Sequence, residues 1–330
     1  MRRAIVTGGA GFIGSHMVDL LLAEGFEVRA IDNLATGRLE NLGQHRADPR
    51  LAVEQVDMCD LGPTARVFDG VDVVFHFGGI GDIVPSIERP VDYMRANVHG
   101  TLAVLEASRR AGVKKFVYAA SSSCFGLAEV PTPEDAPIRP EYPYALSKYL
   151  GELTALHWAR VYRLPVVSIR MFNVYGPRVR TTGVYGAVFG VFLAQKANGR
   201  PLTVVGDGSQ RRDFVYVTDV ARAFLLAAES SLTGEVFNLG AGNPQSINRL
   251  AELIGGPVVH VPKRPGEPDC TWADIGKITR RLGWKPVVSF EDGVAAMLRH
   301  LDDWRSAPLW TPESIQAATK SWFGYLSPTS

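Results

Sequence analysis

Short apolar runs alternate with longer amphipathic stretches along the first half of the chain. The apolar runs have the length of buried strands, and the longer stretches repeat with a helical period. Strands are predicted at 3–8, 27–32, 51–58, 71–78, 114–122 and 165–173, and helices at 13–25, 93–112 and 144–162. This β-α-β alternation predicts an α/β fold with a doubly wound, parallel Rossmann-type sheet and helices on both faces.

The alternation of strands and helices becomes less regular after about residue 175, where glycine, proline and polar residues become frequent. We expect 1–175 to form a nucleotide-binding domain and 176–330 to form mostly a smaller substrate-binding lobe, with about 213–240 rejoining the main sheet. The tail predicts one more helix, with Thr311 as N-cap and Pro312 at its first position. Its aromatic residues are expected to pack on the body: Trp310, Trp322, Phe323 and Tyr325.

Composition narrows the range of partners. The chain has 330 residues, of which 46% are hydrophobic, and a net charge of +1. This charge gives no general electrostatic attraction for nucleic acid or an anionic membrane. Three cysteines without metal-ligand spacing fit a reducing compartment and predict no metal site. A start without a signal peptide, and the lack of a membrane-length apolar run, lead us to expect a cytoplasmic protein.

A glycine-rich loop, TGGAGFIG, joins the first predicted strand to the first predicted helix. Gly8, Gly11 and Gly14 have the places of a dinucleotide loop, in which glycines permit a tight turn and close approach of a pyrophosphate. Phe12 and Ile13 open the helix, whose free N–H groups and positive dipole end attract phosphates. The spacing is G-x-x-G-x-x-G rather than G-x-G-x-x-G.

Further residues that face a cofactor are expected at the carboxyl ends of the strands, where doubly wound sheets bind ligands. Asp32 ends the second strand, and its carboxylate favours NAD over NADP because it binds a ribose diol and repels a 2′-phosphate; Arg38 nearby weakens that preference. Asp57 and Met58 close the third strand, beside the adenine. The same edge adds Asn33, Phe77, Gly78 and Gly79.

Tyr144 and Lys148 lie one helical turn apart in YPYALSKYLGE, so both side chains emerge on one face. A neighbouring ammonium favours the phenolate, and we expect it to lower the pKa of the phenol towards neutrality. The pair therefore predicts an acid/base device next to the bound dinucleotide.

The residues together resemble a known family, the extended short-chain dehydrogenase/reductases, and within it the NAD-dependent nucleotide-sugar epimerase/dehydratase group typified by UDP-galactose 4-epimerase. The resemblance covers nearly the whole chain. It rests on TGGAGFIGSH, IDNLATGRLENL, VFHFGG, NVHGT, FVYAASSSCFG, YALSKYLGE, RMFNVYGPR, GDGSQRRDFVYVTDVA, FNLGAG and RPGEPDCTWADIGK. So many motifs in this order are highly specific for the family and weakly specific for one substrate.

The resemblance implies a role for each matching residue. Tyr144 is the acid/base, Lys148 binds the nicotinamide ribose, and Ser121, with Ser122 beside it, holds the sugar hydroxyl that is oxidised. Asn97 supports the cofactor site from its helix. Implied substrate contacts are Ser122, Ser123, Asn173, Arg178, Arg212, Arg264, Glu267 and Thr271. Tightly bound NAD and a homodimer built on the helices near 93–110 and 144–161 are also implied.

The positions after Ser121 discriminate among reactions. Relatives that eliminate water use an Asp-Glu pair there, and decarboxylating relatives use a Glu, whereas this chain has Ser122 and Ser123, which are not acid/base groups at neutral pH. Cys124 is interpreted as a packing residue, one position out of register with the cysteine of 3,5-epimerising relatives. The sequence also departs from the family pattern at HFGG, where H-L-A-A is common.

The favoured interpretation is therefore a nucleotide-sugar 4-epimerase, whose reaction passes through a transient 4-keto sugar. Thr271 leaves room for an N-acetyl group, so UDP-GlcNAc and UDP-Glc are expected substrates, while Arg178 and Arg180 also resemble the pattern of glucuronate 4-epimerases. Two alternatives stay open: a 4-dehydrogenase or reductase of the same family, and an NAD-binding regulatory or scaffold protein.

Overall fold

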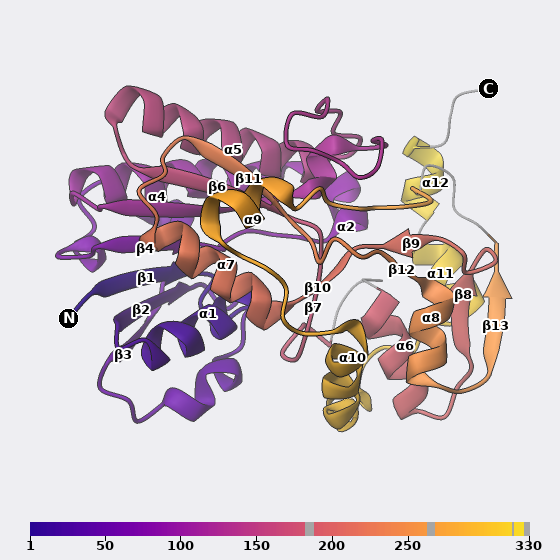
Figure 1. Ribbon diagram of the computed structural model, residues 1–330. Helices are drawn as coiled ribbons and strands as arrows, with labels where there is room; N and C mark the ends of the chain where they lie inside the picture. The colour runs from indigo at the N-terminus through magenta and orange to yellow at the C-terminus, as the bar shows by residue number, and fades with distance from the viewer. Residues whose placement is uncertain (182–187, 263–267, 319, 327–330) are drawn as a thin grey trace.

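A seven-stranded sheet forms the centre of the computed structural model, which describes residues 1–181, 188–262, 268–318 and 320–326 (Figure 1). The strand order is β11-β6-β5-β4-β1-β2-β3, and each pair of neighbours is parallel. The strands are β1 (Arg3–Thr7), β2 (Glu27–Asp32), β3 (Leu51–Gln55), β4 (Val73–His76), β5 (Lys115–Ser121), β6 (Val166–Met171) and β11 (Glu235–Leu239). The predicted doubly wound α/β fold is confirmed.

Helices cover both faces of this sheet because neighbouring residues on each strand point to opposite faces. Val6 packs in a core with α1 (Phe12–Ala23), α7 (Val217–Glu229) and α9 (Gly276–Leu282). Its neighbour Ile5 packs in the opposite core, against α4 (Gly100–Arg110) and α5 (Pro143–Tyr162). Because both faces of the inner strands β1, β4, β5 and β6 are buried, these strands are continuous apolar runs in the sequence.

Two predicted boundaries are wrong, for local reasons. The third strand ends at Gln55 because the Asp57 carboxylate accepts a hydrogen bond from the Cys59 N–H and starts the 3₁₀ turn η2 (Met58–Asp60). The helix predicted at 93–112 is split into α3 (Pro90–Met94), the π-helical segment η4 (Arg95–His99) and α4. Single π-helical turns are frequent at functional sites.

The smaller lobe has a core of its own, which includes Phe192, Leu250 and Val294. Its elements are α6 (Val188–Ala197), α8 (Ile247–Ile254), α10 (Phe290–Arg299), η6 (Leu301–Trp304) and the strand pairs β7 (Asn173–Tyr175) with β10 (Phe214–Tyr216), β9 (Arg211–Arg212) with β12 (Gln245–Ser246), and β8 (Leu202–Val205) with β13 (Val258–Val261). From the segment 213–240, β11 joins the edge of the main sheet, whereas β10 pairs with β7.

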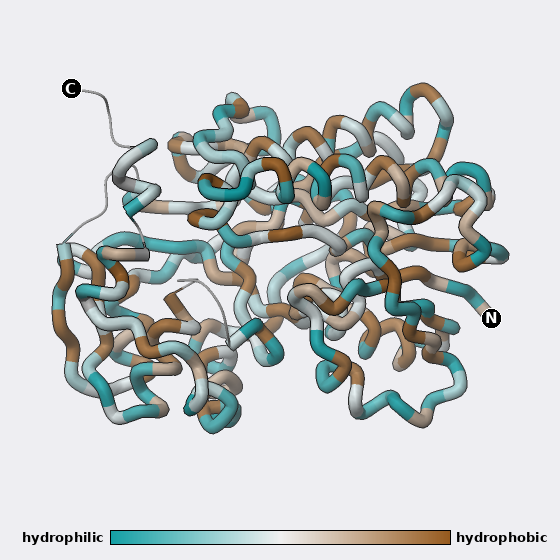
Figure 2. The backbone as a smooth tube through the Cα atoms, turned by 180° about the vertical axis from the view of Figure 1, so that it is seen from behind, coloured by the Kyte–Doolittle hydropathy of each residue, from teal (hydrophilic) through white to brown (hydrophobic). Residues whose placement is uncertain are grey.

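The tail forms two short helices, α11 (Pro312–Ala318) and α12 (Lys320–Leu326), where one helix was predicted. Thr311 caps the first of them, because its hydroxyl accepts from the Ser314 N–H at 3.2 Å. Trp322 packs against Tyr142, but Tyr325 is 78% exposed, so its predicted packing is wrong. Seen from behind, α12 lies on the far side of the molecule from the N-terminus (Figure 2).

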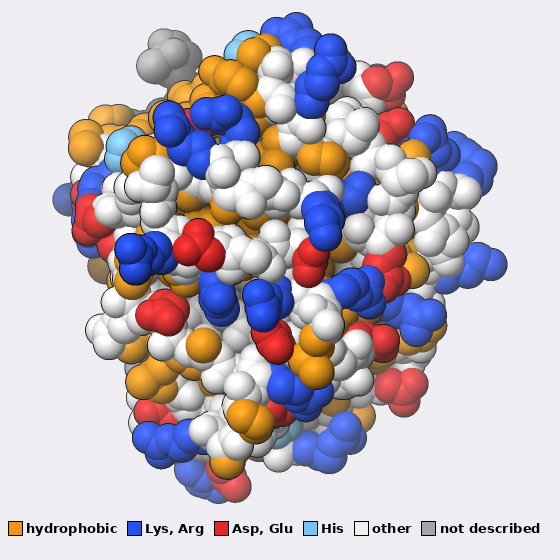
Figure 3. Space-filling model, turned by 90° about the vertical axis from the view of Figure 1, so that its left-hand side faces the viewer, with side chains coloured by type: hydrophobic (Ala, Val, Ile, Leu, Met, Phe, Trp, Pro, Cys, Tyr) orange, Lys and Arg blue, Asp and Glu red, His pale blue; other side chains and the backbone are white. Residues whose placement is uncertain are grey.

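The remaining short elements are connectors: η1 (Leu39–His45), η3 (Arg66–Phe68), α2 (Ile83–Glu88) and η5 (Ser122–Phe125). Figure 3 shows basic and acidic side chains interspersed over one face of the molecule, in keeping with the small net charge. Among the described residues, no helix combines the length and apolarity that a bilayer crossing needs.

Candidate active site

Two adjoining cavities lie at the carboxyl edge of the main sheet. The first, of about 740 Å³, is lined by the glycine loop, the ends of β2, β4 and β5, and both Tyr144 and Lys148. The second, of about 470 Å³, lies between this edge and the smaller lobe. Gly81, Asp82 and Arg180 line both cavities, so the two spaces meet at these residues. We call them the cofactor cavity and the substrate cavity.

The glycine loop lines the cofactor cavity through Gly8, Gly11, Phe12, Ile13 and Gly14. Helix α1 has no side-chain cap and no acidic residue in its first turn, so its first N–H groups and its positive dipole end are available to an anion. Gly8 has φ +66°, and a Cβ on Gly14 would lie 2.1 Å from the Gly8 carbonyl oxygen. These positions require glycine, and the loop fits a pyrophosphate.

Asp32 has two tasks at the end of β2. Its carboxylate accepts hydrogen bonds from the N–H groups of Ala10 at 3.0 Å and Leu34 at 2.8 Å, which fixes the loop around it. It also lines the cofactor cavity together with Asn33 and Asp57, whereas Arg38 is not among the lining residues. A carboxylate in this place suits the two hydroxyls of an NAD ribose.

The unusual Gly78 and Gly79 have a steric explanation. A Cβ on Gly78 would lie 2.6 Å from the Met58 sulfur, and one on Gly79 would lie 2.5 Å from the Asn97 side-chain oxygen. Asn97 is fully buried, and it holds the next residue by accepting from the Ile80 N–H at 2.8 Å and donating to the Ile80 carbonyl at 3.0 Å. Met58, Phe77, Gly78 and Gly79 line the cofactor cavity, and Asn97 supports them from η4.

Tyr144 and Lys148 both reach the cofactor cavity from the first turns of α5. Burial lowers the pKa of Lys148 to about 8, and its ammonium lies 4.7 Å from the centre of the Tyr118 ring. Burial raises the pKa of Tyr144, and a hydrogen bond with the Ser121 side chain opposes that rise. The expected lowering of the phenol pKa by Lys148 is therefore not seen in the protein alone.

Three serines lie at the end of β5 and in the turn η5 that follows it, and their contacts differ. The Ser121 side chain interacts with the Tyr144 phenol, and its hydroxyl donates to the Ser123 hydroxyl at 3.0 Å. Ser122 and Ser123 line the substrate cavity. Cys124 is buried among Phe125 and other apolar neighbours, and burial raises its pKa to about 12, which fits its interpretation as a packing residue.

The expected substrate residues converge from both lobes. The Thr271 hydroxyl donates to the Asn173 side-chain oxygen at 2.9 Å, and both residues line the substrate cavity. Arg212 also lines it and donates to the Pro268 carbonyl at 2.9 Å. Arg264 and Glu267 lie outside the described residues.

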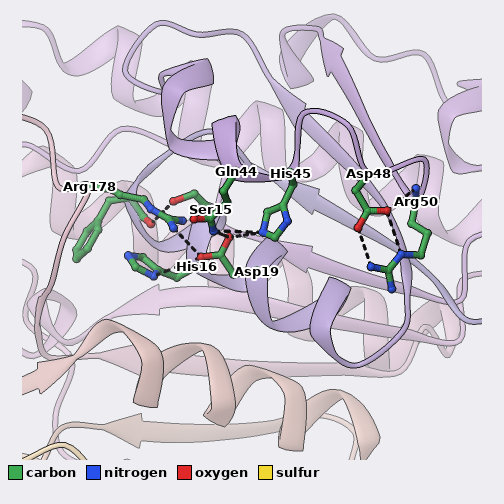
Figure 4. A network of polar contacts seen from close by, with 9 residues as sticks. Ser15, His16, Asp19, Gln44, His45, Asp48, Arg50 and Arg178 are labelled. Atoms are coloured by element: carbon green, nitrogen blue, oxygen red, sulfur yellow. Dashed lines mark hydrogen bonds and ion pairs between the residues drawn. The ribbon is translucent and has the colours of Figure 1, made fainter.

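Arg178 has a different position from the one expected. Its guanidinium pairs with Asp19 of α1 at 2.8 Å, within a network that includes His45 and Gln44 (Figure 4), and it lines neither cavity. The backbone of Arg178 is in the left-handed region, with φ +66°, where its side chain pairs with α1. Arg180, paired with Asp82 at 3.0 Å, is the arginine that lines both cavities.

Several lining residues were not predicted from the sequence: Asp82, Tyr93, Tyr142 and Trp322. Tyr142 carried a usable signal, because it precedes Tyr144 by two residues in YPY. Trp322 carried none, because its place depends on how the end of the chain folds back on α2.

Comparisons with known proteins agree with this geometry. A sequence model of the NAD dependent epimerase/dehydratase family matches residues 4–240. A UDP-glucose 4-epimerase of Mycolicibacterium smegmatis is 36% identical over 306 residues, which cover 89% of this chain and 96% of the relative. Other similar proteins are named dTDP-glucose 4,6-dehydratases.

Two solved structures of 4-epimerases are similar to this chain in fold and in sequence. The UDP-glucose 4-epimerase of Thermotoga maritima, solved with UDP-glucose, has a TM-score of 0.84 and 34% identity, and covers 91% of this chain and 99% of its own. The UDP-glucuronic acid 4-epimerase of Bacillus cereus, solved with UDP-glucuronic acid and NAD, has a TM-score of 0.85 and 30% identity, with the same coverage. The chain therefore belongs to the NAD-dependent epimerase/dehydratase family of extended short-chain dehydrogenase/reductases, and its cofactor is NAD.

Proposed function

We propose that the protein is a nucleotide-sugar 4-epimerase that interconverts gluco- and galacto-configured UDP-sugars. The observation that carries this proposal is that Tyr144 lines the cofactor cavity and interacts with Ser121 and with Asp82, the latter a residue that lines both cavities. A sugar held in the substrate cavity then presents its C4 carbon to the cofactor and its C4 hydroxyl to the phenol.

The residues of this chain have defined tasks in such a reaction. Tyr144, as phenolate, takes the proton of the C4 hydroxyl, which Ser121 holds in place. Bound NAD would supply the hydride acceptor for oxidation at C4 and the hydride donor for re-reduction. The 4-keto sugar turns about its diphosphate link and presents its other face, and Tyr144 gives the proton back. Lys148, one helical turn from Tyr144 on α5, would hold the ribose of the cofactor.

The substrate cavity disfavours elimination of water. Dehydration needs a positioned acid and base beside the reacting carbons, and the positions that follow Ser121 are Ser122 and Ser123. Among the lining residues described, the carboxylates are Asp82 and Glu141, and Asp82 is paired with Arg180. Ser122 and Ser123 have no proton that titrates near neutral pH, so they do not provide the acid and base that dehydration needs. We therefore propose oxidation and re-reduction at C4 as the reaction.

We infer that the sugar is a glucose, N-acetylglucosamine or glucuronic acid unit. Thr271 lines the cavity with a small side chain next to Asn173, which leaves room for an N-acetyl group. Arg180 is a cation at the junction of the two cavities, and a carboxylate at C6 would compete with Asp82 for it. Arg212 is placed to bind the diphosphate.

A homodimer is part of the proposal. Apolar side chains on α4 and α5 remain exposed, among them Leu102 at 37%, Leu153 at 43% and Val161 at 49%. Two copies of this helix pair would bury these side chains against each other. Light scattering after gel filtration is expected to give twice the 35.9 kDa mass of the chain, and a monomer would contradict the dimer.

The test is an incubation of the purified protein, without added cofactor, with UDP-Glc, UDP-GlcNAc and UDP-GlcA in separate samples, followed by proton NMR. Conversion of one sugar to its galacto isomer, with no net NADH, is the expected result. An oxidised sugar that forms only with added NAD would move the assignment to a 4-dehydrogenase. NAD binding without turnover of any nucleotide sugar would favour a regulatory or scaffold role.

A further inference from the structure

The C-terminal helix α12 forms part of the substrate cavity, although it lies about 180 residues from Tyr144 in the sequence. Trp322 is among the lining residues, and its ring centre lies 5.8 Å from that of Tyr142. The alignment with the Thermotoga maritima structure includes 99% of that chain but 91% of this one, so part of this chain has no counterpart there.

The tail is held in place by a specific contact. The Ser321 hydroxyl donates to the Glu88 carboxylate at 2.8 Å, which ties α12 to the end of α2. Helix α2 lines the same cavity through Ile83 and Val84. The indole of Trp322 therefore completes a wall that the start of α2 begins.

The aromatic contacts show which end of the cavity Trp322 closes. Tyr142 lies parallel to Tyr144, with ring centres 6.4 Å apart and an interplanar angle of 8°. Tyr142 thus neighbours the rings of both Tyr144 and Trp322, whereas Arg212 and Pro268 come from the smaller lobe. These ring contacts associate Trp322 with the part of the cavity near Tyr144, where we expect the sugar to react.

We propose that α12 is a cap on the sugar end of the substrate cavity and that Trp322 is a specificity-determining residue, whose indole limits the size of the sugar substituents. This inference rests on the proposed function. A flat, rigid ring excludes water and fixes the width of the space, since an aromatic side chain presents a large apolar face at a low entropic cost.

The test compares kcat/KM for UDP-GlcNAc with that for UDP-Glc in the wild type, Trp322→Ala, Trp322→Phe and Tyr325→Ala. Loss of the indole is expected to raise this ratio about tenfold, the size of effect typical of added space in a substrate pocket, with Trp322→Phe in between. Tyr325→Ala is the matched control, because Tyr325 lies on the same helix and is 78% exposed. Its ratio is expected to stay within twofold of the wild type.

A ratio in Trp322→Ala and Trp322→Phe equal to that of Tyr325→Ala would overturn the role of Trp322. Trp322→Phe keeps an aromatic ring against Tyr142, so it remains informative if the alanine variant does not fold. A wild type without turnover of UDP-Glc, UDP-GlcNAc or UDP-GlcA would overturn the proposed function, which is a different result from an active wild type with an unchanged ratio.

Discussion

The cofactor cavity and the substrate cavity are built from different kinds of segment. The cofactor cavity draws on strand ends and the turns that follow them, most of them within one stretch from Thr7 to Tyr93, and the sheet topology fixes their places. The substrate cavity draws on loops, two-stranded pairs and helices that range from Gly81 to Trp322. Cofactor choice is thus encoded locally, whereas substrate choice depends on contacts between distant segments.

The largest effect is expected where the two cavities meet. Tyr144→Phe removes the acid/base but keeps the ring that packs beside Tyr142, so turnover should fall by about 10³-fold or more, while NAD content and thermal stability stay close to the wild type. NMR of the sugar mixture at fixed times measures turnover, absorbance of the nucleotide released on denaturation measures NAD content, and a thermal melt measures stability. Near-normal turnover would remove Tyr144 from the chemistry.

Gly14→Ala should break the cofactor cavity alone. Its Cβ would lie 2.1 Å from a backbone oxygen that cannot move aside, so a loss of about 3 kcal/mol of stability and most of the NAD content is expected. Gly43→Ala is the control, because a Cβ there meets nothing within 4 Å. Equal NAD content and urea midpoints in the two variants would contradict the packing of the loop.

Lys148→Met should lower activity and raise the free energy of unfolding. Burial lowers the lysine pKa from 10.5 to about 8, so the charged side chain destabilises the folded state by about 3 kcal/mol below pH 8. The penalty disappears as the pH rises through 10.5, because the unfolded lysine is then neutral as well. Urea unfolding of nucleotide-free protein should show a stability gain for the variant at pH 7 and little at pH 11; the same gain at both values would point to packing instead.

The smallest effect is expected deep in the substrate cavity. Thr271→Tyr fills the space beside Asn173, so kcat/KM for UDP-GlcNAc should fall about tenfold relative to UDP-Glc. Thr271→Ser keeps the hydroxyl and serves as the control. An unchanged preference in the tyrosine variant would show that the N-acetyl group lies elsewhere.

Local patterns were enough to predict the sheet and most of the cofactor cavity. Gly8, Gly14 and Asp32 owe their places to a strand, a turn and a helix in succession, which periodicity and glycine spacing reveal. The π-helical turn at η4 was not predictable in this way, because it keeps the apolar pattern of the helix around it.

The substrate side was less predictable because its residues owe their places to tertiary contacts. Arg178 and Arg180 are two positions apart, and only the left-handed backbone at Arg178 and its ion pair with Asp19 decide which one reaches the cavities. The pKa of Tyr144 follows from burial, which sequence spacing does not report. Trp322 depends on the packing of α12 on α2.

The most direct test of 4-epimerisation is turnover of the accepted UDP-sugar in D₂O, with proton NMR of substrate and product. Oxidation and re-reduction at C4 by a retained hydride predict a galacto isomer that keeps protium at both C4 and C5, with no net change in NADH. Deuterium at C5 would contradict this mechanism, because it would show removal of the C5 proton, the step that dehydration requires.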